Sequence, residues 1–170
     1  MELAQAPAGI PPSGALTLMR TDPKTQGPKL FQQHCASCHN YLDAAGKGIR
    51  AEEPSAPNLH GFSSEAWIKG LLDPKQVAGP NYFGNTAFKD DEMVHYVRST
   101  LKELLDDEEL KETFPKMVRA LAAESERKPG EEADEETVFL FEDFGCTDCH
   151  KFHGSGDLGS APDLTGYGSH

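Results

Sequence analysis

The four cysteines of this sequence form two pairs with the same spacing, and a histidine follows each pair. Both segments read C-x-x-C-H, the pattern typical of covalent attachment of c-type haem. Two thiols three residues apart can each form a thioether with one haem vinyl group, and the next imidazole becomes an axial ligand of the iron. The sequence therefore predicts two haem c groups, with thioethers and axial imidazoles supplied by Cys35, Cys38 and His39, and by Cys146, Cys149 and His150.

Three other uses of paired cysteines compete with haem attachment. A Cys₄ zinc site leaves the histidine after each pair unexplained, and the pairs lie far apart in the chain, at 35–38 and 146–149. A thioredoxin-like dithiol needs a strand before it and a helix after it. Here glycine and polar residues follow each pair, which does not fit that context. A disulfide across two residues is geometrically awkward. Haem attachment remains the preferred interpretation.

Length and charge narrow the class of protein. The 170 residues suffice for one ordinary domain or two small ones. The net charge of −12 argues against binding to nucleic acid or anionic lipid. No run of 18 apolar residues indicates a membrane span, and the N-terminal segment lacks the basic start and apolar stretch of a signal peptide.

Short helices and a loop are predicted around the first cysteine pair, Cys35 and Cys38. An extended lead-in covers 1–26, and a short helix begins near Gly27-Pro28 and runs to Cys35. Residues 40–62 are predicted to be loop. Ser63 or Ser64 is expected to cap a helix over 65–72, which ends before Asp73-Pro74.

Two further helices and a linker are predicted before the second pair. The first helix begins near Asp90 or Asp91, with an apolar face formed by Val94, Val97, Leu101 and Leu104. The second covers 107–123, and Pro115 is expected to kink it. Residues 124–136 are predicted to be a solvated linker, followed by 137–144, which leads into the second pair. The predicted organisation is thus a lead-in (1–26), a first haem domain (27–105), an acidic helix and linker (106–136), and the start of a second haem domain (137–170).

Negative charge is concentrated in one stretch. Residues 103–143 hold 15 acidic and 5 basic residues, or −10 of the total of −12. We interpret this stretch as a solubilising face and tether. The alternative is a docking patch for a basic electron-transfer partner.

An internal repeat relates the two haem motifs. Residues 56–64 and 161–169 both read A-P-[ND]-L-x-G-[FY]-[SG]-S. The repeat places Pro57 and Pro162 in equivalent loops on the histidine side of each haem. There a prolyl carbonyl can accept a hydrogen bond from the ring N–H of the axial histidine and orient it.

The second copy of the repeat is short. Only 21 residues follow Cys149, too few to bury a core by themselves. We expect the sequence to be truncated at its C-terminus. Because haem is attached to C-x-x-C-H outside the cytoplasmic membrane, we also expect a fragment of a longer anchored polypeptide, or a chain located behind a membrane domain.

The motifs resemble class I c-type cytochromes. G-P-K-L-F-x-x-H-C-A-S-C-H, with A-P-N-L-x-G-F and W-I-x-G-L-L-D-P downstream, is similar to the two-haem cytochrome c portion of bacterial cytochrome bc-type complexes. The resemblance implies an all-α fold with two haem domains in tandem, the second incomplete. It also implies a methionine as the usual sixth iron ligand.

For the first haem, that sixth ligand is expected to be Met93, although no proline follows it as in the usual context. The alternative is that Met93 is a packing residue, and His60 and His95 are poorer ligands. For the second haem no methionine follows Cys149. His153 lies too close to His150 to cross the haem and His170 is terminal, so this position is expected to be vacant or filled by a stray group.

The resemblance implies an electron carrier rather than an enzyme. It places the chain on the periplasmic face of the cytoplasmic membrane, with the anchor outside this sequence. Electrons are expected from cytochrome b and Rieske subunits, and a soluble cytochrome or terminal oxidase would accept them. The alternatives are a two-haem peroxidase-like enzyme with one open iron and a haem-based ligand sensor.

Overall fold

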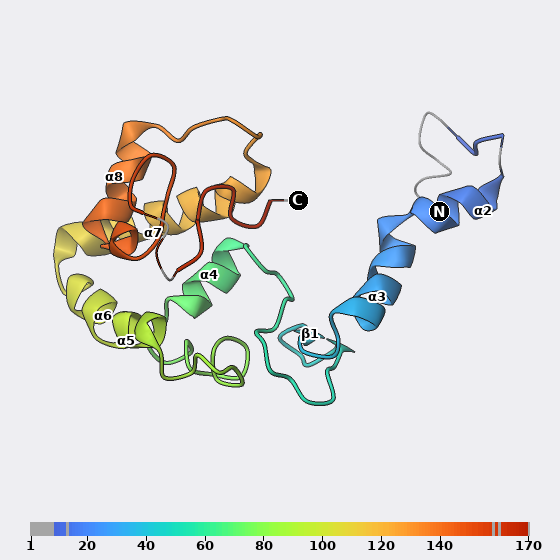
Figure 1. The fold of residues 1–170 in the computed structure, drawn as a ribbon, viewed down its shortest axis with the longest axis horizontal. Helices are drawn as coiled ribbons and strands as arrows, with labels where there is room; N and C mark the ends of the chain where they lie inside the picture. The colour runs from blue at the N-terminus through green and yellow to red at the C-terminus, as the bar shows by residue number, and fades with distance from the viewer. Residues whose placement is uncertain (1–8, 13, 158, 160, 170) are drawn as a thin grey trace. The chain divides into compact units, whose positions relative to one another are not determined.

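The computed structural model describes residues 9–12, 14–157, 159 and 161–169, which fold mainly as helices (Figure 1). This confirms the expected all-α class. The chain divides into two compact units, one up to His60 and one from Gly61. The predicted domain boundaries at 26/27, 105/106 and 136/137 do not coincide with this division, and the two tandem haem domains stay a prediction.

The described part of the N-terminal unit includes the helices α2 (Ala15–Thr21) and α3 (Pro23–His34). The prediction of an extended lead-in was therefore wrong from Ala15 onward. The Asp22 carboxylate accepts hydrogen bonds from the Lys24 backbone N–H at 3.2 Å and the Thr25 hydroxyl at 2.6 Å. With Pro23 in the first turn, this cap starts α3 earlier than Gly27 and leaves Pro28 inside the helix.

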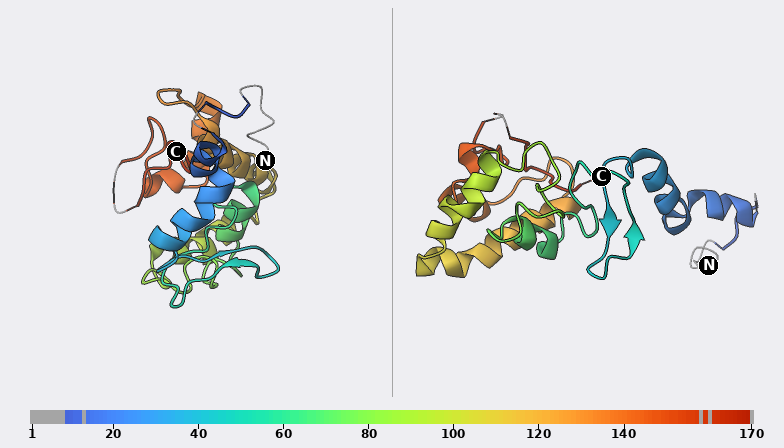
Figure 2. Two further views of the ribbon diagram at one scale, coloured as in Figure 1. Left: turned by 90° about the vertical axis from the view of Figure 1, so that its right-hand side faces the viewer. Right: turned by 90° about the horizontal axis from the view of Figure 1, so that it is seen from below.

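A short hairpin follows within the predicted loop. Strands β1 (Tyr41–Leu42) and β2 (Gly48–Ile49) pair antiparallel, and the right-hand view of Figure 2 shows them as two arrows. The Asp43 carboxylate closes the turn by accepting from the Ala45 and Lys47 N–H groups at 2.9 and 2.8 Å. The buried residues described in this unit are Asn40, Ala51 and Asn58. The described part of the N-terminal unit thus has no apolar core.

Helix α4 (Glu65–Leu71) opens the C-terminal unit as predicted. The Ser64 hydroxyl caps it by accepting from the Trp67 N–H at 3.2 Å. The helix ends before Asp73-Pro74, and Trp67 and Ile68 are buried.

The next predicted helix is present but divided. Helix α5 (Glu92–Arg98) is separated from α6 (Thr100–Leu104) at Ser99, whose hydroxyl donates to the His95 carbonyl at 2.6 Å. The break leaves the predicted apolar face intact, because Val94, Val97 and Leu101 are all buried and Leu104 packs against the core.

Helix α7 (Glu108–Ala123) continues through Pro115 as one element and is capped by Asp107. A 3₁₀ turn, η1 (Glu124–Glu126), follows it, and helix α8 (Glu135–Asp143) leads to a second 3₁₀ turn, η2 (Cys146–Asp148). The predicted solvated linker, 124–136, was wrong at both ends, because η1 covers Glu124–Glu126 and α8 begins at Glu135. The Glu124 side chain is also 0% exposed, and its carboxylate accepts hydrogen bonds from groups inside the protein, among them the Arg127 side chain.

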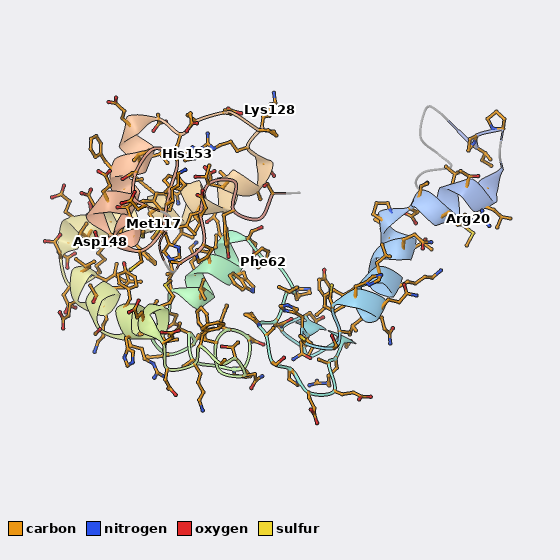
Figure 3. All side chains as sticks on the ribbon, in the orientation of Figure 1. Arg20, Phe62, Met117, Lys128, Asp148 and His153 are labelled. Atoms are coloured by element: carbon orange, nitrogen blue, oxygen red, sulfur yellow. The ribbon has the colours of Figure 1, made fainter. Side chains whose placement is uncertain are left out.

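The core of the C-terminal unit joins segments from both sides of the second haem motif. Helix α7 packs against both α4 and α8 (Figure 1). The Phe141 and Phe152 rings stack with centroids 3.7 Å apart, and Met117 lies among the side chains of this unit in Figure 3. The buried members include Ile68, Val77, Val94, Val97, Leu101, Met117, Val118, Phe141, Phe144 and Phe152. Residues after 137 therefore share a core with the helices before them.

Length and polarity exclude a membrane-crossing role for every helix in the described part of the chain.

Two phenylalanines of α8 provide a test of this core. Phe141 is 0% exposed, whereas Phe139 is 58% exposed. Phe141→Ala should lower the free energy of unfolding by about 3–5 kcal/mol, because it removes buried apolar surface and leaves a cavity. Phe139→Ala should change it by less than about 0.5 kcal/mol. Urea unfolding of the haem-bearing protein, followed by far-ultraviolet circular dichroism, measures both. Equal effects would contradict the packing described.

Candidate haem sites

The first C-x-x-C-H segment begins at the C-terminus of α3, where Cys35 is the capping residue. Its backbone turns tightly, because the Cys38 and His39 N–H groups both donate to the Cys35 carbonyl, at 3.1 and 2.9 Å. This turn holds both thiols and the imidazole in one short segment of fixed backbone.

The imidazole of His39 is bonded to the predicted proline. Its Nδ1 lies 2.7 Å from the Pro57 carbonyl oxygen. A carbonyl oxygen only accepts hydrogen bonds, so Nδ1 carries the proton and a neutral imidazole has its lone pair on Nε2. This is the tautomer that a metal-binding histidine needs.

The second segment has the same local geometry. The His150 and Cys149 N–H groups donate to the Cys146 carbonyl, at 2.9 and 3.4 Å. The Nδ1 atom of His150 lies 2.7 Å from the Pro162 carbonyl oxygen. The same reasoning therefore leaves the Nε2 lone pair of His150 available to a metal.

The match between the two copies extends beyond the histidines. The Leu59 N–H donates to the Asn40 carbonyl at 2.9 Å, and the Leu164 N–H donates to the Lys151 carbonyl at 2.8 Å. In the loop that follows, Gly61 and Gly166 both have a positive φ, 68° and 69°. Such a backbone favours glycine, which explains its presence in both copies. The sequence repeat is thus a repeat of backbone structure.

The four thiols differ in environment. All are free; Cys38 and Cys149 are exposed, and Cys35 and Cys146 are partly buried. The Ser37 hydroxyl, with help from Ser55, lowers the pKa of the Cys38 thiol. Burial raises the pKa of the Cys146 thiol to about 12.

Tyr96 of α5 joins the second segment to the helices before it. Its hydroxyl donates to the carbonyl of Phe144, two residues before Cys146. The phenol is also within hydrogen-bonding reach of the Cys146 sulfur, and burial raises its pKa. Helix α5 thus contacts the second attachment segment directly.

These residues fit haem c. Each segment offers two free thiols and an imidazole whose Nδ1 is held by a prolyl carbonyl, the orientation expected of an iron ligand. Across the described residues, no group of three or more His, Cys, Asp and Glu side chains is gathered as a metal site would need.

The other candidate ligands are dispersed. Met93 belongs to the C-terminal unit and packs, half-buried, against its core, so its role as sixth ligand of the first haem stays a prediction. His60 packs edge-on against Tyr41 with ring centroids 5.2 Å apart. His170 lies outside the described residues.

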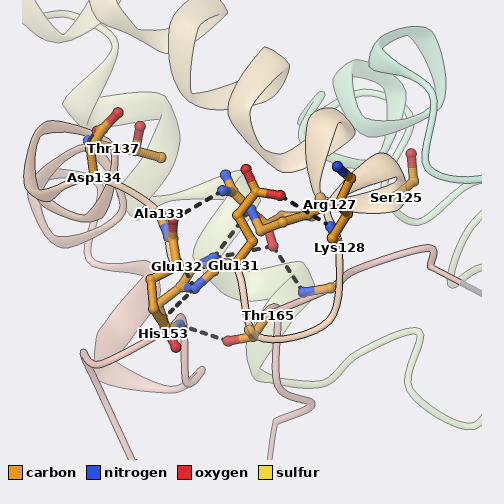
Figure 4. A network of polar contacts seen from close by, with 12 residues as sticks. Ser125, Arg127, Lys128, Glu131, Glu132, Ala133, Asp134, Thr137, His153 and Thr165 are labelled. Atoms are coloured by element: carbon orange, nitrogen blue, oxygen red, sulfur yellow. Dashed lines mark hydrogen bonds and ion pairs between the residues drawn. The ribbon is translucent and has the colours of Figure 1, made fainter.

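A buried ionic cluster near the second segment was not predicted. His153 is buried, with its Nε2 3.1 Å from a Glu124 carboxylate oxygen and its Nδ1 2.9 Å from Glu132 (Figure 4). Burial raises the pKa of the Glu124 carboxyl, but the Gly166 N–H, His153 and Arg127 together bring it below its ordinary value. Nothing in the sequence distinguishes Glu124 from its acidic neighbours, because two of its partners, His153 and Gly166, lie 29 and 42 residues away.

Comparison with known proteins gives one family. The cytochrome c family model matches residues 25–113, which is 89 of the 170 residues and includes the first C-x-x-C-H segment. Searches of curated proteins and of solved structures found no match.

The rate at which each thiol reacts before haem attachment tests the different surroundings of Cys38 and Cys146. In the haem-free chain at neutral pH, iodoacetamide should modify Cys38 faster than Cys146, because the thiolate is the nucleophile and the Cys146 pKa is raised to about 12. Mass spectrometry of timed digests measures each rate. If Cys146 reacted as fast as Cys38, the described packing around Cys146 would be wrong.

Proposed function

The chain belongs to the cytochrome c family, and we propose that it transfers electrons through two haem c groups, one on each C-x-x-C-H segment. The family supports a c-type cytochrome with covalently bound haem that carries electrons. The presence of a second haem rests on the observation that both copies have the same histidine–proline bond, at 2.7 Å in each.

The residues of the chain hold and orient each group. Cys35 and Cys38 in the first copy, and Cys146 and Cys149 in the second, supply the sulfur atoms for the thioether bonds. The prolyl carbonyl fixes the orientation of the imidazole ring. It also makes the Nε2 lone pair more basic, and so a stronger ligand for a metal. When bound, haem supplies a one-electron ferric–ferrous couple, which suits transfer without chemistry on a substrate.

Met93 is our proposed sixth ligand of the first haem. It is the first methionine after that motif, and the family match includes it. Thioether sulfur favours ferrous iron and so raises the reduction potential. For the second haem, His153 is already bonded to Glu124 and Glu132, which disfavours it as a ligand.

The cellular setting follows from the family and the sequence resemblance. Cytochrome c domains are typically extracytoplasmic, and we place this chain on the periplasmic face of the cytoplasmic membrane. We further propose that it belongs to a cytochrome bc-type quinol-oxidising complex. Electrons would then arrive from the cytochrome b and Rieske subunits and leave to a soluble cytochrome or a terminal oxidase.

Paired cysteine variants test the two attachment sites. After export through a haem-attachment pathway, the parent chain should carry two haems by intact mass. Cys35→Ala with Cys38→Ala should carry one, on 146–150, and Cys146→Ala with Cys149→Ala should carry one, on 35–39. Peptide mapping assigns the position. A parent chain with a single haem would contradict the two-haem proposal.

Substitution of Met93 tests the sixth ligand. In the variant that keeps only the first haem, Met93→Ala should abolish the weak near-infrared band of thioether–iron ligation, admit carbon monoxide and lower the reduction potential. Met117→Leu is the control, because Met117 is a buried core residue. An unchanged spectrum and potential would show that Met93 only packs. Rapid turnover of hydrogen peroxide by the unsubstituted protein would instead favour the peroxidase alternative.

A further inference from the structure

The two haem loops are closed by different side chains. In the first copy, the Asn58 amide bridges the loop: its oxygen accepts from the Leu42 N–H at 3.0 Å, and its nitrogen donates to the Leu42 carbonyl at 2.8 Å. Leu42 lies three residues after His39, and Asn58 directly follows Pro57. One amide therefore ties the histidine arm of the loop to the proline arm.

The second copy cannot use this device. Asp163 replaces the asparagine, and a carboxylate has no proton to donate. Its oxygen accepts from the Thr165 N–H at 2.8 Å, within the proline arm itself. His153 occupies the position of Leu42, and its N–H donates to the Thr165 hydroxyl at 2.6 Å.

Glu124 supplies a second connection between the same two arms. Its carboxylate accepts from the Gly166 N–H at 2.9 Å, on the proline arm. It also contacts the His153 Nε2 at 3.1 Å, on the histidine arm. Glu124 directly follows α7, so it anchors the loop to a helix that contributes Met117, Val118 and Leu121 to the core.

The buried Glu124 carboxylate needs partners that compensate its charge. The Glu124 side chain is 0% exposed, and an ionised carboxylate in that position costs several kcal/mol unless hydrogen bonds and a counter-charge compensate it. Three groups compensate the buried charge. The Arg127 Nε lies 2.6 Å from one carboxylate oxygen, and the Gly166 N–H and the His153 Nε2 also contact the carboxylate. Arg127 and Gly166 donate to different oxygens, and an amide has only one acceptor oxygen, so glutamine would lose the charge and at least one of these hydrogen bonds.

The first copy has no comparable group. Asn40 and Asn58, the buried polar residues described in the N-terminal unit, are uncharged. Removal of the Glu124 charge would leave Arg127 as an uncompensated positive charge, which disfavours the ferric, more positive form of a haem on Cys146 and Cys149 and so raises its reduction potential. Glu132 faces the same His153 from the surface, where its side chain is 73% exposed and solvent screens it.

We propose that Glu124 is a positioning residue of the second haem site, which holds the loop that orients His150 and whose charge keeps the reduction potential of that haem lower than it would be without the carboxylate. The proposal rests on the proposed function, since it requires a haem on Cys146 and Cys149. The contacts between Glu124 and a haem loop are both to the second copy, at His153 and Gly166.

Potentiometric titration of single-haem proteins tests this role. In the Cys35→Ala, Cys38→Ala protein, Glu124→Gln should raise the potential of the remaining haem, with the reduced-to-oxidised ratio at a fixed potential rising threefold to tenfold. A tenfold change corresponds to about 59 mV for a one-electron couple. In the Cys146→Ala, Cys149→Ala protein, the same substitution should leave the potential unchanged.

Two further variants separate charge from structure. Glu132→Gln is the matched control and should leave both potentials unchanged. Glu124→Asp keeps the charge and should restore a potential closer to that of the parent than Glu124→Gln does. If Glu124→Gln left the second haem's potential unchanged, or shifted both haems equally, the inference would fail while the proposed function stood. If the Cys35→Ala, Cys38→Ala protein carried no haem at all, the second haem of the proposed function would fail, and the inference with it.

Discussion

The hydrogen bond from an imidazole Nδ1 to a prolyl carbonyl is the constraint on which both candidate sites depend. It occurs at 2.7 Å between His39 and Pro57 and again between His150 and Pro162. The carbonyl decides where the proton lies, and the proton decides which nitrogen is free to bind a metal. A C-x-x-C-H segment without this bond would still offer thiols, but its imidazole would have neither a fixed tautomer nor a fixed orientation.

Different interactions hold this hydrogen bond in place in the two copies. In the N-terminal unit, the Asn58 amide and the backbone carry the loop, and the described residues include no apolar core. In the C-terminal unit, a core of packed helices and the buried Glu124 carry it. Covalent attachment is compatible with both arrangements, because thioether bonds retain a haem without a large enclosing core. The same histidine–proline bond in unequal surroundings is a physical basis for two different potentials in one chain.

Most features that sequence analysis predicted are set by neighbours in the chain. The Ser64 cap and the apolar spacing of Val94, Val97 and Leu101 depend on residues a few positions apart. The two prolines lie 18 and 12 residues from their histidines, and the repeat in the sequence indicated them. One of the errors has the opposite origin. Glu124 was assigned to a solvated linker because that segment is polar, whereas two of its partners come from residues 153 and 166. The start of α3 was misplaced because Pro28 resembles a first-turn proline, although Asp22-Pro23 supplies a stronger start.

The central claim, that a prolyl carbonyl orients each axial imidazole, is tested most directly by nuclear magnetic resonance of the ferric protein labelled with ¹⁵N-histidine. The account predicts two hyperfine-shifted imidazole Nδ1–H signals, one for each haem, that exchange slowly with water because each proton is held in a hydrogen bond. It would be contradicted if either signal exchanged as fast as that of an unrestrained imidazole, or if only one metal-bound histidine were detected.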